Sequence, residues 1–321
     1  MASIEQAIDS YLSDLAVGQS PKTVSTYRSS LHRFTEYLET AGIAASEPAD
    51  RLTVDQALHF VQWLSRKISK ASLRTYIAPI SRLYHYLSRE RMIDLSVSDV
   101  ERLSEAFKNY RKGAKRHAPR LPAEGAVSSL LEAARGIPAQ RTHRLELARV
   151  RNIAILEALR VSGMRVGELV RLTCGDLNAK DMTAKVTGKG DKDRIVYFNR
   201  TAWQAVQDYL RLRDGQHSSE SLPVFSRHNR QASGQVLPMT TDSVRDVFTD
   251  LSAAGHLSTH VTPHGLRHAF GTIAYEATGD LAAVQDLLGH ASPETTRIYA
   301  EMSSKRLIRA HHLAFGEGVG I

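Results

Sequence analysis

The sequence predicts a mainly α-helical chain with a small antiparallel β-sheet, divided into a helical N-terminal domain and an α+β C-terminal domain. Its 321 residues are long for one core, because domains usually hold about 100 to 150 residues. Helical spacing of apolar residues runs through the first part without a strand pattern, and only one later segment alternates as strands do. We therefore predict domains at 1–110 and 122–321, joined by a linker at 111–121.

The N-terminal domain is expected to contain helices at 20–38, 53–67, 71–89 and 98–110. Ser20 followed by Pro21 is typical of a helix start, since serine caps the first turn and proline suits its first position. Core residues then recur at helical spacing at Tyr27, Leu31 and Phe34. Pro79 is expected to kink the third helix.

Basic residues mark the parts of this half that are expected to face a polyanionic partner. The side opposite the core positions of the first predicted helix carries Lys22, Arg28 and Arg33. The linker carries further basic residues and almost no apolar ones, among them Lys112, Lys115 and Arg116. Such a run fits a solvated tether as well as a phosphate contact, and its place between two domains of a basic chain favours phosphate contact.

The C-terminal domain is expected to begin with helices and then to form a hairpin. Residues 183–187 and 194–198 read as strands around the tight G-K-G-D turn at 188–191. Helices are expected to follow at 202–213, 241–251, 266–277 and 280–288, the last ended by Gly289.

Charge and cysteine content restrict the class of protein. Forty-two Lys and Arg against 34 Asp and Glu give a formal charge of +8, which favours a polyanionic partner. The single cysteine, Cys174, excludes an internal disulfide framework and predicts a cytoplasmic protein. No basic start followed by an apolar run opens the chain, and no segment of about 18 apolar residues occurs, so neither secretion nor a membrane is expected.

Five short blocks follow one another in the C-terminal half. They are G-M-R-V-G-E-L at 163–169, G-K-G at 188–190, P-H-G-L-R-H at 263–268, L-L-G-H at 287–290 and T-T-R-I-Y at 295–299. In this order the blocks resemble those of the tyrosine recombinases, the phage integrase and Xer-type site-specific recombinases, over residues 121–302. The N-terminal half is similar, less specifically, to their helical, SAM-like core-binding domain. Small departures are Met164, Gly167 and Tyr197, and none carries reacting groups.

The resemblance implies a site-specific DNA recombinase that cuts and rejoins strands through a covalent 3′-phosphotyrosine. It implies a double-stranded DNA recombination site as partner and a homotetramer on two such sites, with or without a paralogous recombinase. Carried over position by position, the implied catalytic set is Arg165, Lys189, His264, Arg267, His290 and the nucleophile Tyr299.

The chemistry of phosphodiester cleavage fits these residue types. Attack by an oxygen builds negative charge on the non-bridging phosphate oxygens, and Arg165 and Arg267 can each offer paired N–H donors there. A tyrosine hydroxyl has a reference pKa of about 10 and needs a base, for which His264 is the candidate. His290 either donates to a phosphate oxygen or orients the phenol. Lys189 on the hairpin turn is the candidate acid for the departing 5′-oxygen.

Two further residues are expected to support the site. Glu168, three residues after Arg165 on one predicted helix, is positioned to brace the basic cluster. His268 follows His264 at i+4, which could suggest zinc, but no glutamate lies between them and Arg267 would repel the cation, so a supporting role is expected. No metal and no cofactor are predicted.

Two other functions remain open on the residues alone. The same phosphotyrosine chemistry would serve a relaxing enzyme of the type IB topoisomerase kind. The chain could also be a DNA-binding protein without catalysis, against which the six catalytic-type residues argue.

Overall fold

The fold is taken from a computed structural model, which divides the chain into two compact units, Met1–His117 and Ala118–Ile321. The division falls inside the segment predicted as the linker. The structure describes residues 2–111, 121–123, 125–188, 192–215, 218–229, 235–257, 260–289 and 296–299. Helices dominate both units and the second contains a small antiparallel sheet, so the predicted fold class is confirmed.

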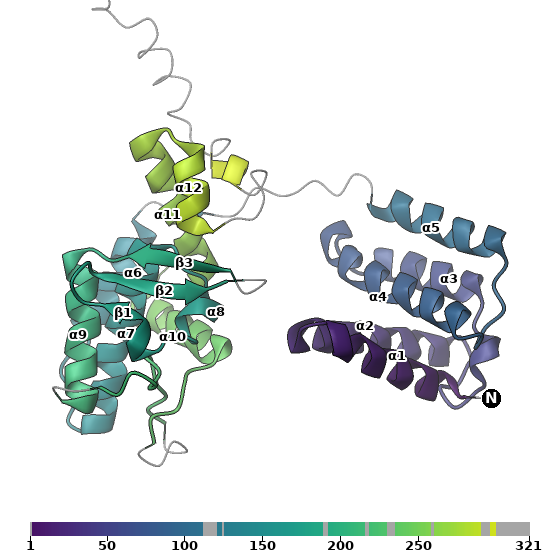
Figure 1. The fold of residues 1–321 in the computed structure, drawn as a ribbon, viewed down its shortest axis with the longest axis horizontal. Helices are drawn as coiled ribbons and strands as arrows, with labels where there is room; N and C mark the ends of the chain where they lie inside the picture. Colours follow the sequence, from purple (N-terminus) through teal and green to yellow (C-terminus); the bar gives the residue numbers. More distant parts are fainter. Residues whose placement is uncertain are drawn as a thin grey trace, which may run out of the picture. The chain divides into compact units, whose positions relative to one another are not determined.

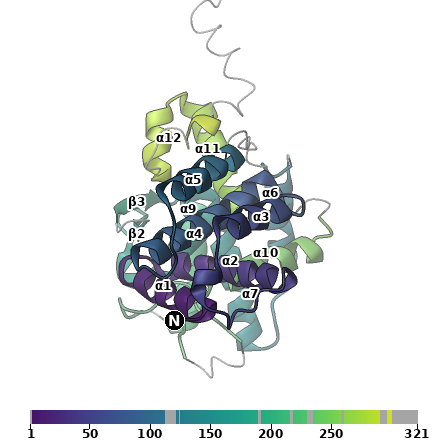
Figure 2. The same ribbon diagram turned by 90° about the vertical axis from the view of Figure 1, so that its right-hand side faces the viewer.

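The N-terminal unit is a bundle around one central helix. Its helices are α1 (Ile4–Gly18), α2 (Pro21–Thr40), α3 (Val54–Ser65), α4 (Lys70–Arg89) and α5 (Val97–Arg111), with a 3-10 turn at Ala49–Arg51. Helix α4 packs against each of the others. Figures 1 and 2 show α1 and α2 on one side of α4 and α5 on the other. Phe34, Phe60 and Tyr84 fill the centre as a cluster of tilted aromatic rings.

Local sequence signals explain where these helices begin. Ser20 caps α2 by accepting a hydrogen bond from the backbone N–H of Thr23, as predicted from Ser20 and Pro21. Helix α1, which the sequence analysis did not delimit, begins with a capping box between Ser3 and Gln6. Pro79 lies inside α4, which continues through it. Proline leaves the carbonyl of Thr75 without its helical donor, and the Ser30 hydroxyl of α2, which donates to Thr26 at 2.9 Å, lies 3.5 Å from that oxygen.

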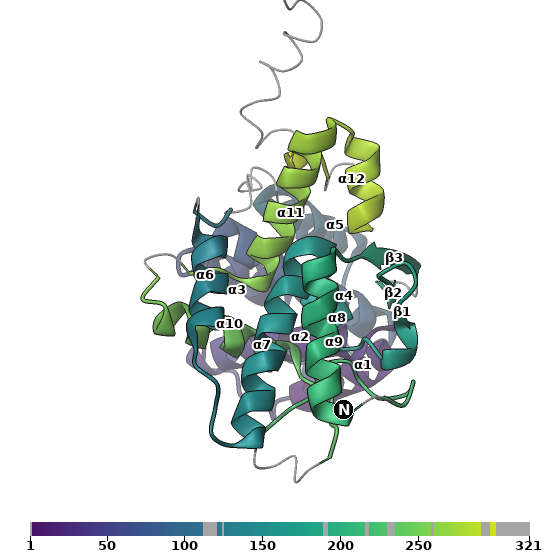
Figure 3. The ribbon, with the colours of Figure 1, turned by 90° about the vertical axis from the view of Figure 1, so that its left-hand side faces the viewer.

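The C-terminal unit is organised around α7. Its helices are α6 (Ala126–Gly136), α7 (His143–Ser162), α8 (Val166–Leu169), α9 (Arg200–Asp214), α10 (Thr241–Ala254), α11 (Pro263–Thr278) and α12 (Leu281–Leu288), with a 3-10 turn at Cys174–Asp176. Helix α7 packs against α6, α9 and α11, and residues 296–299 are helical. Figure 3 shows α6, α7 and α9 side by side with α11 and α12 at one end.

The sheet has the order β1-β2-β3, from β1 (Leu177–Asn178), β2 (Thr183–Thr187) and β3 (Asp193–Tyr197). Strands β2 and β3 form the predicted hairpin, in which Lys185 is paired with Ile195. The backbone N–H of Gly188 donates to the carbonyl of Lys192 at 2.8 Å and closes its base. Strand β1 was not predicted, because two residues carry no alternation that a sequence could reveal. No helix in the described ranges is long and apolar enough to cross a membrane.

Candidate active site

Arg165 owes its position to a glycine at the end of α7. Gly163 adopts the left-handed conformation, with φ of 60°, and ends the helix. An added Cβ there would lie 2.5 Å from the ring of Phe270, so the close approach of α11 also requires glycine. The chain then turns so that Arg165 is the N-cap residue of α8. Its guanidinium donates to Glu168 at 2.8 Å and to the carbonyl of Gly289 at 3.2 Å.

Arg267 lies on the first turns of α11 and is almost completely buried. Its guanidinium donates to the carbonyls of Gly163 at 2.5 Å and Leu288 at 2.7 Å. These two bonds fix the plane of the guanidinium between the end of α7 and the end of α12. Burial, together with the nearby charge of Arg165, lowers the pKa of Arg267 to about 10, which still leaves it charged at neutral pH.

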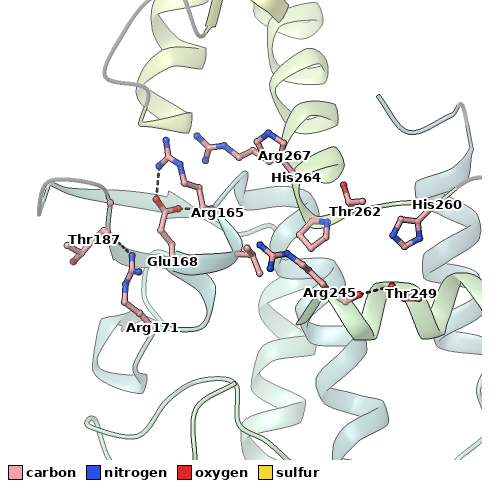
Figure 4. Close-up of a pocket in the computed structure, with 14 residues that line it drawn as sticks. Arg165, Glu168, Arg171, Thr187, Arg245, Thr249, His260, Thr262, His264 and Arg267 are labelled. Atoms are coloured by element: carbon pink, nitrogen blue, oxygen red, sulfur yellow. Dashed lines mark hydrogen bonds and ion pairs between the residues drawn. The ribbon is translucent and has the colours of Figure 1, made fainter. Parts of the chain in front are cut away.

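A pocket of about 960 Å³ brings the two arginines together with His264. Figure 4 shows Arg165, Arg267 and His264 reaching the same space from α8 and α11. The lining residues that carry polar or charged side chains are Arg165, Glu168, Arg171, Thr187, Arg245, Thr249, His260, Thr262, His264 and Arg267. Positive groups therefore dominate the walls, as an anionic ligand requires.

His268 connects His264 with Tyr299. Its Nδ1 lies 3.1 Å from the Tyr299 hydroxyl oxygen, and its Nε2 lies 2.9 Å from Nε2 of His264. The three side chains thus form one hydrogen-bonded row, of which His264 is the member that lines the pocket. The sequence analysis predicted His264 as the base for the phenol. In this structure His268 lies between the two, and the role of His264 as the base stays a prediction.

Tyr299 is fully buried and is not among the residues that line the pocket. Its ring lies on α11 over Gly271, where an added Cβ would come within 2.6 Å of Cζ. Tyr275, Val284 and Leu288 belong to the same buried apolar cluster as Tyr299. Burial raises the pKa of the Tyr299 hydroxyl, although the charges of Arg267 and Arg165 oppose that rise. The phenol is therefore protonated in this arrangement.

Both imidazoles are kept neutral. Burial lowers the pKa of His264, and the charges of Arg267 and Arg165 lower it further. Burial likewise lowers the pKa of His268 to about 4, with His264 and Arg267 acting in the same direction. A neutral imidazole can accept a proton, so the electrostatics of the row suit a base more than an acid.

Glu168 is a buried carboxylate shared by two arginines. It accepts hydrogen bonds from the backbone N–H and the guanidinium of Arg165 and from both terminal nitrogens of Arg194. Burial alone would raise the pKa of Glu168, but the hydrogen bonds from Arg194 and Arg165 hold it at about 2. The predicted brace at Glu168 therefore has a second arginine, on β3, that the sequence analysis did not single out.

Comparison with known proteins decides what kind of site this is. The phage integrase family model matches residues 124–306, and the SAM-like N-terminal domain of phage integrases matches residues 8–91. This chain belongs to the phage integrase family. It is a site-specific tyrosine recombinase of the Xer type or a related integrase, an enzyme that cleaves and rejoins DNA. The type IB topoisomerase and the non-catalytic DNA-binding protein are thereby set aside.

Curated relatives cover almost the whole chain. Tyrosine recombinase XerD of Listeria innocua is 30% identical over 310 residues, which is 94% of this chain and 95% of that protein. Tyrosine recombinase XerC of Pediococcus pentosaceus is 28% identical over 308 residues and 92% of each chain. The solved XerH recombinase bound to a palindromic difH substrate, in a post-cleavage complex, has a TM-score of 0.68. It is 21% identical, covers 91% of this chain and 79% of that one, and shows that the fold is shared.

The predicted integrase residues fall into three groups. Arg165, Glu168, His264 and Arg267 line the pocket, and His268 and Tyr299 lie behind them. The predicted positions Lys189 and His290, and the linker residues Lys112, Lys115 and Arg116, lie outside the described residues.

The three predicted DNA contacts of α2 are exposed but do not share one environment. Arg28 borders a depression lined by Glu5 and Asp9 of α1. Arg33 lies 5.5 Å from the ring centroid of Trp63 on α3 and pairs with a glutamate of its own helix. Lys22, in the first turn of α2, is exposed. Contact of each with DNA stays a prediction.

Arg171, Arg245 and His260 form an outer rim of the pocket that the sequence analysis missed. Arg171 donates to the backbone carbonyl of Thr187 on β2 at 2.8 Å, and Arg245 pairs with Asp242 on its own helix. None of the three lies in a motif block, so only the folded chain identifies them. Within the described ranges, no group of three metal-ligating side chains occurs.

Proposed function

We propose that this recombinase cleaves one DNA strand by attack of the Tyr299 hydroxyl on a phosphodiester held in the pocket of Arg165, Arg267 and His264. A 3′-phosphotyrosine forms as the bond to the 5′-oxygen breaks, and the new 5′-hydroxyl leaves with a proton from Lys189. The 5′-hydroxyl of a second duplex then attacks the phosphotyrosine and releases Tyr299. Because the phosphoester is conserved, the reaction needs no nucleotide, and the fixed charges of Arg165 and Arg267 supply the stabilisation for which a metal would otherwise serve.

The observation that carries this assignment is the meeting of two arginines and a neutral histidine from segments about a hundred residues apart. A trigonal-bipyramidal phosphate carries extra charge on its non-bridging oxygens, which the two guanidinia would stabilise. Tyr299 lies behind His268, so its hydroxyl has to advance toward the pocket to react. His264 is the imidazole that it would meet there, and a bound phosphate would raise the pKa of His264 and make it a better base.

Double-stranded DNA is the proposed partner of both units. In the N-terminal unit, α4 carries the exposed residues Lys70, Arg74 and Arg82 and no acidic residue within its bounds. Helix α1 carries Glu5, Asp9 and Asp14 and no basic one. This asymmetry favours approach of DNA to the α2 and α4 side and not to α1.

We also propose that the protein works as a tetramer on two DNA sites, as the family resemblance implies. The palindromic substrate of the XerH relative fits a two-fold pair of protomers on each site. Either four copies of this chain or two copies with a paralogous recombinase would satisfy the symmetry. The proposed place of action is the cytoplasm, which the single unpaired cysteine, Cys174, supports.

The test of the proposed function is covalent capture from a random DNA pool. Duplexes with a randomised centre carry a nick a few nucleotides from it, so that cleavage releases a short 5′-hydroxyl fragment and traps the protein. We expect wild-type protein to accumulate detergent-resistant adducts on related sequences, with the DNA attached to the peptide that contains Tyr299. Absence of any adduct, or attachment elsewhere, would contradict the proposal. Recombined duplexes from the selected sequence distinguish strand exchange from simple relaxation.

The division of labour between His264 and His268 gives a matched pair of variants on one helix. His264→Asn is expected to lower the single-turnover cleavage rate of the selected DNA by about 10²- to 10⁴-fold, the usual contribution of a general base. His268→Asn, which removes the hydrogen-bond partner of the resting phenol, is expected to cost less than about tenfold. A larger loss for His268→Asn would reverse the two roles and make His268 the base.

The pH dependence of cleavage follows from the depressed pKa of His264. Only the neutral imidazole accepts a proton, so the rate rises with pH through the pKa and is constant above it. When the concentrations of protein and DNA are well below the dissociation constant of their complex, the pH profile of the cleavage rate reports the pKa of the free protein. The rise of the rate with pH, its acid limb, should then lie below pH 6.5. His264→Asn should lose that limb. An acid limb at or above pH 6.5 would contradict the neutral state of His264.

A further inference from the structure

Arg194 is a largely buried cation on β3 of the hairpin. Its side chain is 12% exposed, and both of its terminal nitrogens bind the carboxylate of Glu168, at 2.7 and 2.8 Å. The Nε atom is buried without a hydrogen-bond partner in the described part of the chain. Arg194 does not line the pocket. The guanidinium of Arg194 therefore contacts the carboxylate of Glu168 and is not part of the pocket wall.

The carboxylate of Glu168 lies between two arginines that differ in exposure. Its own side chain is 1% exposed, that of Arg165 is 38% exposed, and Arg165 uses only Nη1 for the side-chain contact. The two terminal nitrogens of Arg194 bind one carboxylate oxygen of Glu168 each. The guanidinium of Arg165 therefore makes only a single hydrogen bond to Glu168. The remaining donors of Arg165 are left for the carbonyl of Gly289 and for the pocket.

Removal of Arg194 would leave Arg165 as the remaining arginine bound to the carboxylate of Glu168. A buried carboxylate that loses its strongest partner either takes up a proton or draws the remaining cation into a paired contact. Arg165 is that cation, since its backbone N–H and Nη1 already bind Glu168. A two-pronged pairing of Arg165 with Glu168 would use the fork of N–H donors that the phosphate needs.

Gly289 connects Arg165 to the end of α12. The residue has φ of +62°, and an added Cβ would lie 2.7 Å from Cδ of Arg194. Its carbonyl accepts the hydrogen bond from Arg165. Arg194 therefore packs against the C-terminal end of α12, and it is the second residue of β3.

We propose that Arg194 is a positioning residue, which holds both oxygens of Glu168 and thereby keeps the guanidinium of Arg165 available to the scissile phosphate. The role rests on the proposed function, because it assigns Arg165 to the phosphate. It does not depend on which DNA sequence is cut.

The test compares Arg194→Met, Arg194→Lys and the double variant Glu168→Gln with Arg194→Met, on the DNA captured by wild-type protein. Arg194→Met should lower the single-turnover cleavage rate by about 10- to 100-fold, less than the loss of a direct phosphate donor. Arg194→Lys, which keeps the charge but binds one oxygen, should recover part of that loss. The double variant should cleave at least about tenfold faster than Arg194→Met, because a neutral amide does not capture Arg165.

A pH series separates positioning from a general loss of structure. Without Arg194 the pKa of Glu168 rises, since its main charge partner is gone and burial acts in the same direction. Protonated Glu168 no longer attracts Arg165, so the ratio of the wild-type rate to the Arg194→Met rate should fall as pH falls. Lys185→Met on the neighbouring strand, where an exposed lysine pairs with Asp193, is the matched control and should stay within about twofold of wild type.

Two results would overturn the inference. One is an Arg194→Met rate equal to that of wild type, and the other is a double variant no faster than Arg194→Met. Melting temperatures of all variants are measured alongside, and rates are compared well below the lowest of them. Wild-type protein in the same assay tests the proposed function separately, because its failure to form the adduct at Tyr299 would refute that assignment and not the role of Arg194.

Discussion

Tyr299→Phe should abolish the covalent protein–DNA adduct while leaving the fold and DNA binding intact. The phenol ring fills the space over Gly271 and beside Tyr275, and phenylalanine fills it equally. The substitution removes the hydroxyl and its hydrogen bond to His268, which should cost about 1 kcal/mol of stability. Arg165, Arg267 and His264, which surround the proposed phosphate, carry no hydroxyl that could form a stable phosphoester in its place, so we expect no adduct.

Tyr275→Phe is the matched control, because Tyr275 lies in the same buried cluster on α11. It should still form the adduct, and both variants should bind the selected DNA with wild-type affinity in a gel-shift measurement. An adduct formed by Tyr299→Phe would assign the nucleophile to another residue. Loss of the adduct in both variants would show that the cluster, and not the hydroxyl, is responsible.

The positions of the helices could be predicted because the residues that begin and end each helix lie next to it in the sequence. Ser20 and Pro21 mark the start of α2, and Gly289 marks the end of α12, each through the backbone of its own turn. Strand β1 escaped prediction because its two residues are strands only through pairing with β2. Helix α1 has the same kind of capping signal as α2, between Ser3 and Gln6, and a closer search for capping boxes would have found it.

Some residues of the candidate site could be predicted from the sequence, and the contacts between distant segments could not. The motif blocks predicted the two arginines and His264 by type and order, and Glu168 by its distance of three residues from Arg165. The contact between His268 and Tyr299 spans 31 residues, and that between Arg194 and Glu168 spans 26. No periodicity reports such contacts, since they arise from how α11, α8 and β3 pack. An arginine in a short strand reads as a solvated residue until its carboxylate partner is seen.

The end of α12 explains why the blocks occur together. Helices leave their last carbonyls without helical donors, and here Leu288 and Gly289 receive Arg267 and Arg165 instead. The carbonyl of Gly163 at the end of α7 receives Arg267 as well. Two helix ends thus orient two guanidinia, which are held in place before any phosphate arrives. The glycines of the G-M-R and L-L-G-H blocks are therefore part of how the arginines are positioned.

Lys189→Ala should separate the proton needed by the leaving group from the charge needed by the phosphate. An alkoxide leaving group requires a proton as the bond breaks, so loss of a general acid should slow cleavage of ordinary DNA by about 10²- to 10⁴-fold. A thiolate, with a reference pKa of about 8.5, leaves without that help. The selected DNA with sulfur in place of the scissile 5′-oxygen should therefore be cleaved by Lys189→Ala within about tenfold of the wild-type rate.

Arg267→Ala supplies the contrast, because the guanidinium of Arg267 serves the non-bridging oxygens and those are unchanged in the sulfur substrate. The cleavage rate of Arg267→Ala should be about 10²- to 10³-fold below the wild-type rate on both ordinary DNA and the sulfur-substituted DNA. The single-turnover rates of the three proteins on the two substrates form the measurement, with binding checked at the same DNA concentrations. If sulfur leaves the Lys189→Ala defect as large as before, the lysine only binds phosphate. The acid must then be His264 or His290, and of these His264, neutral and beside two arginines, is the poorer donor.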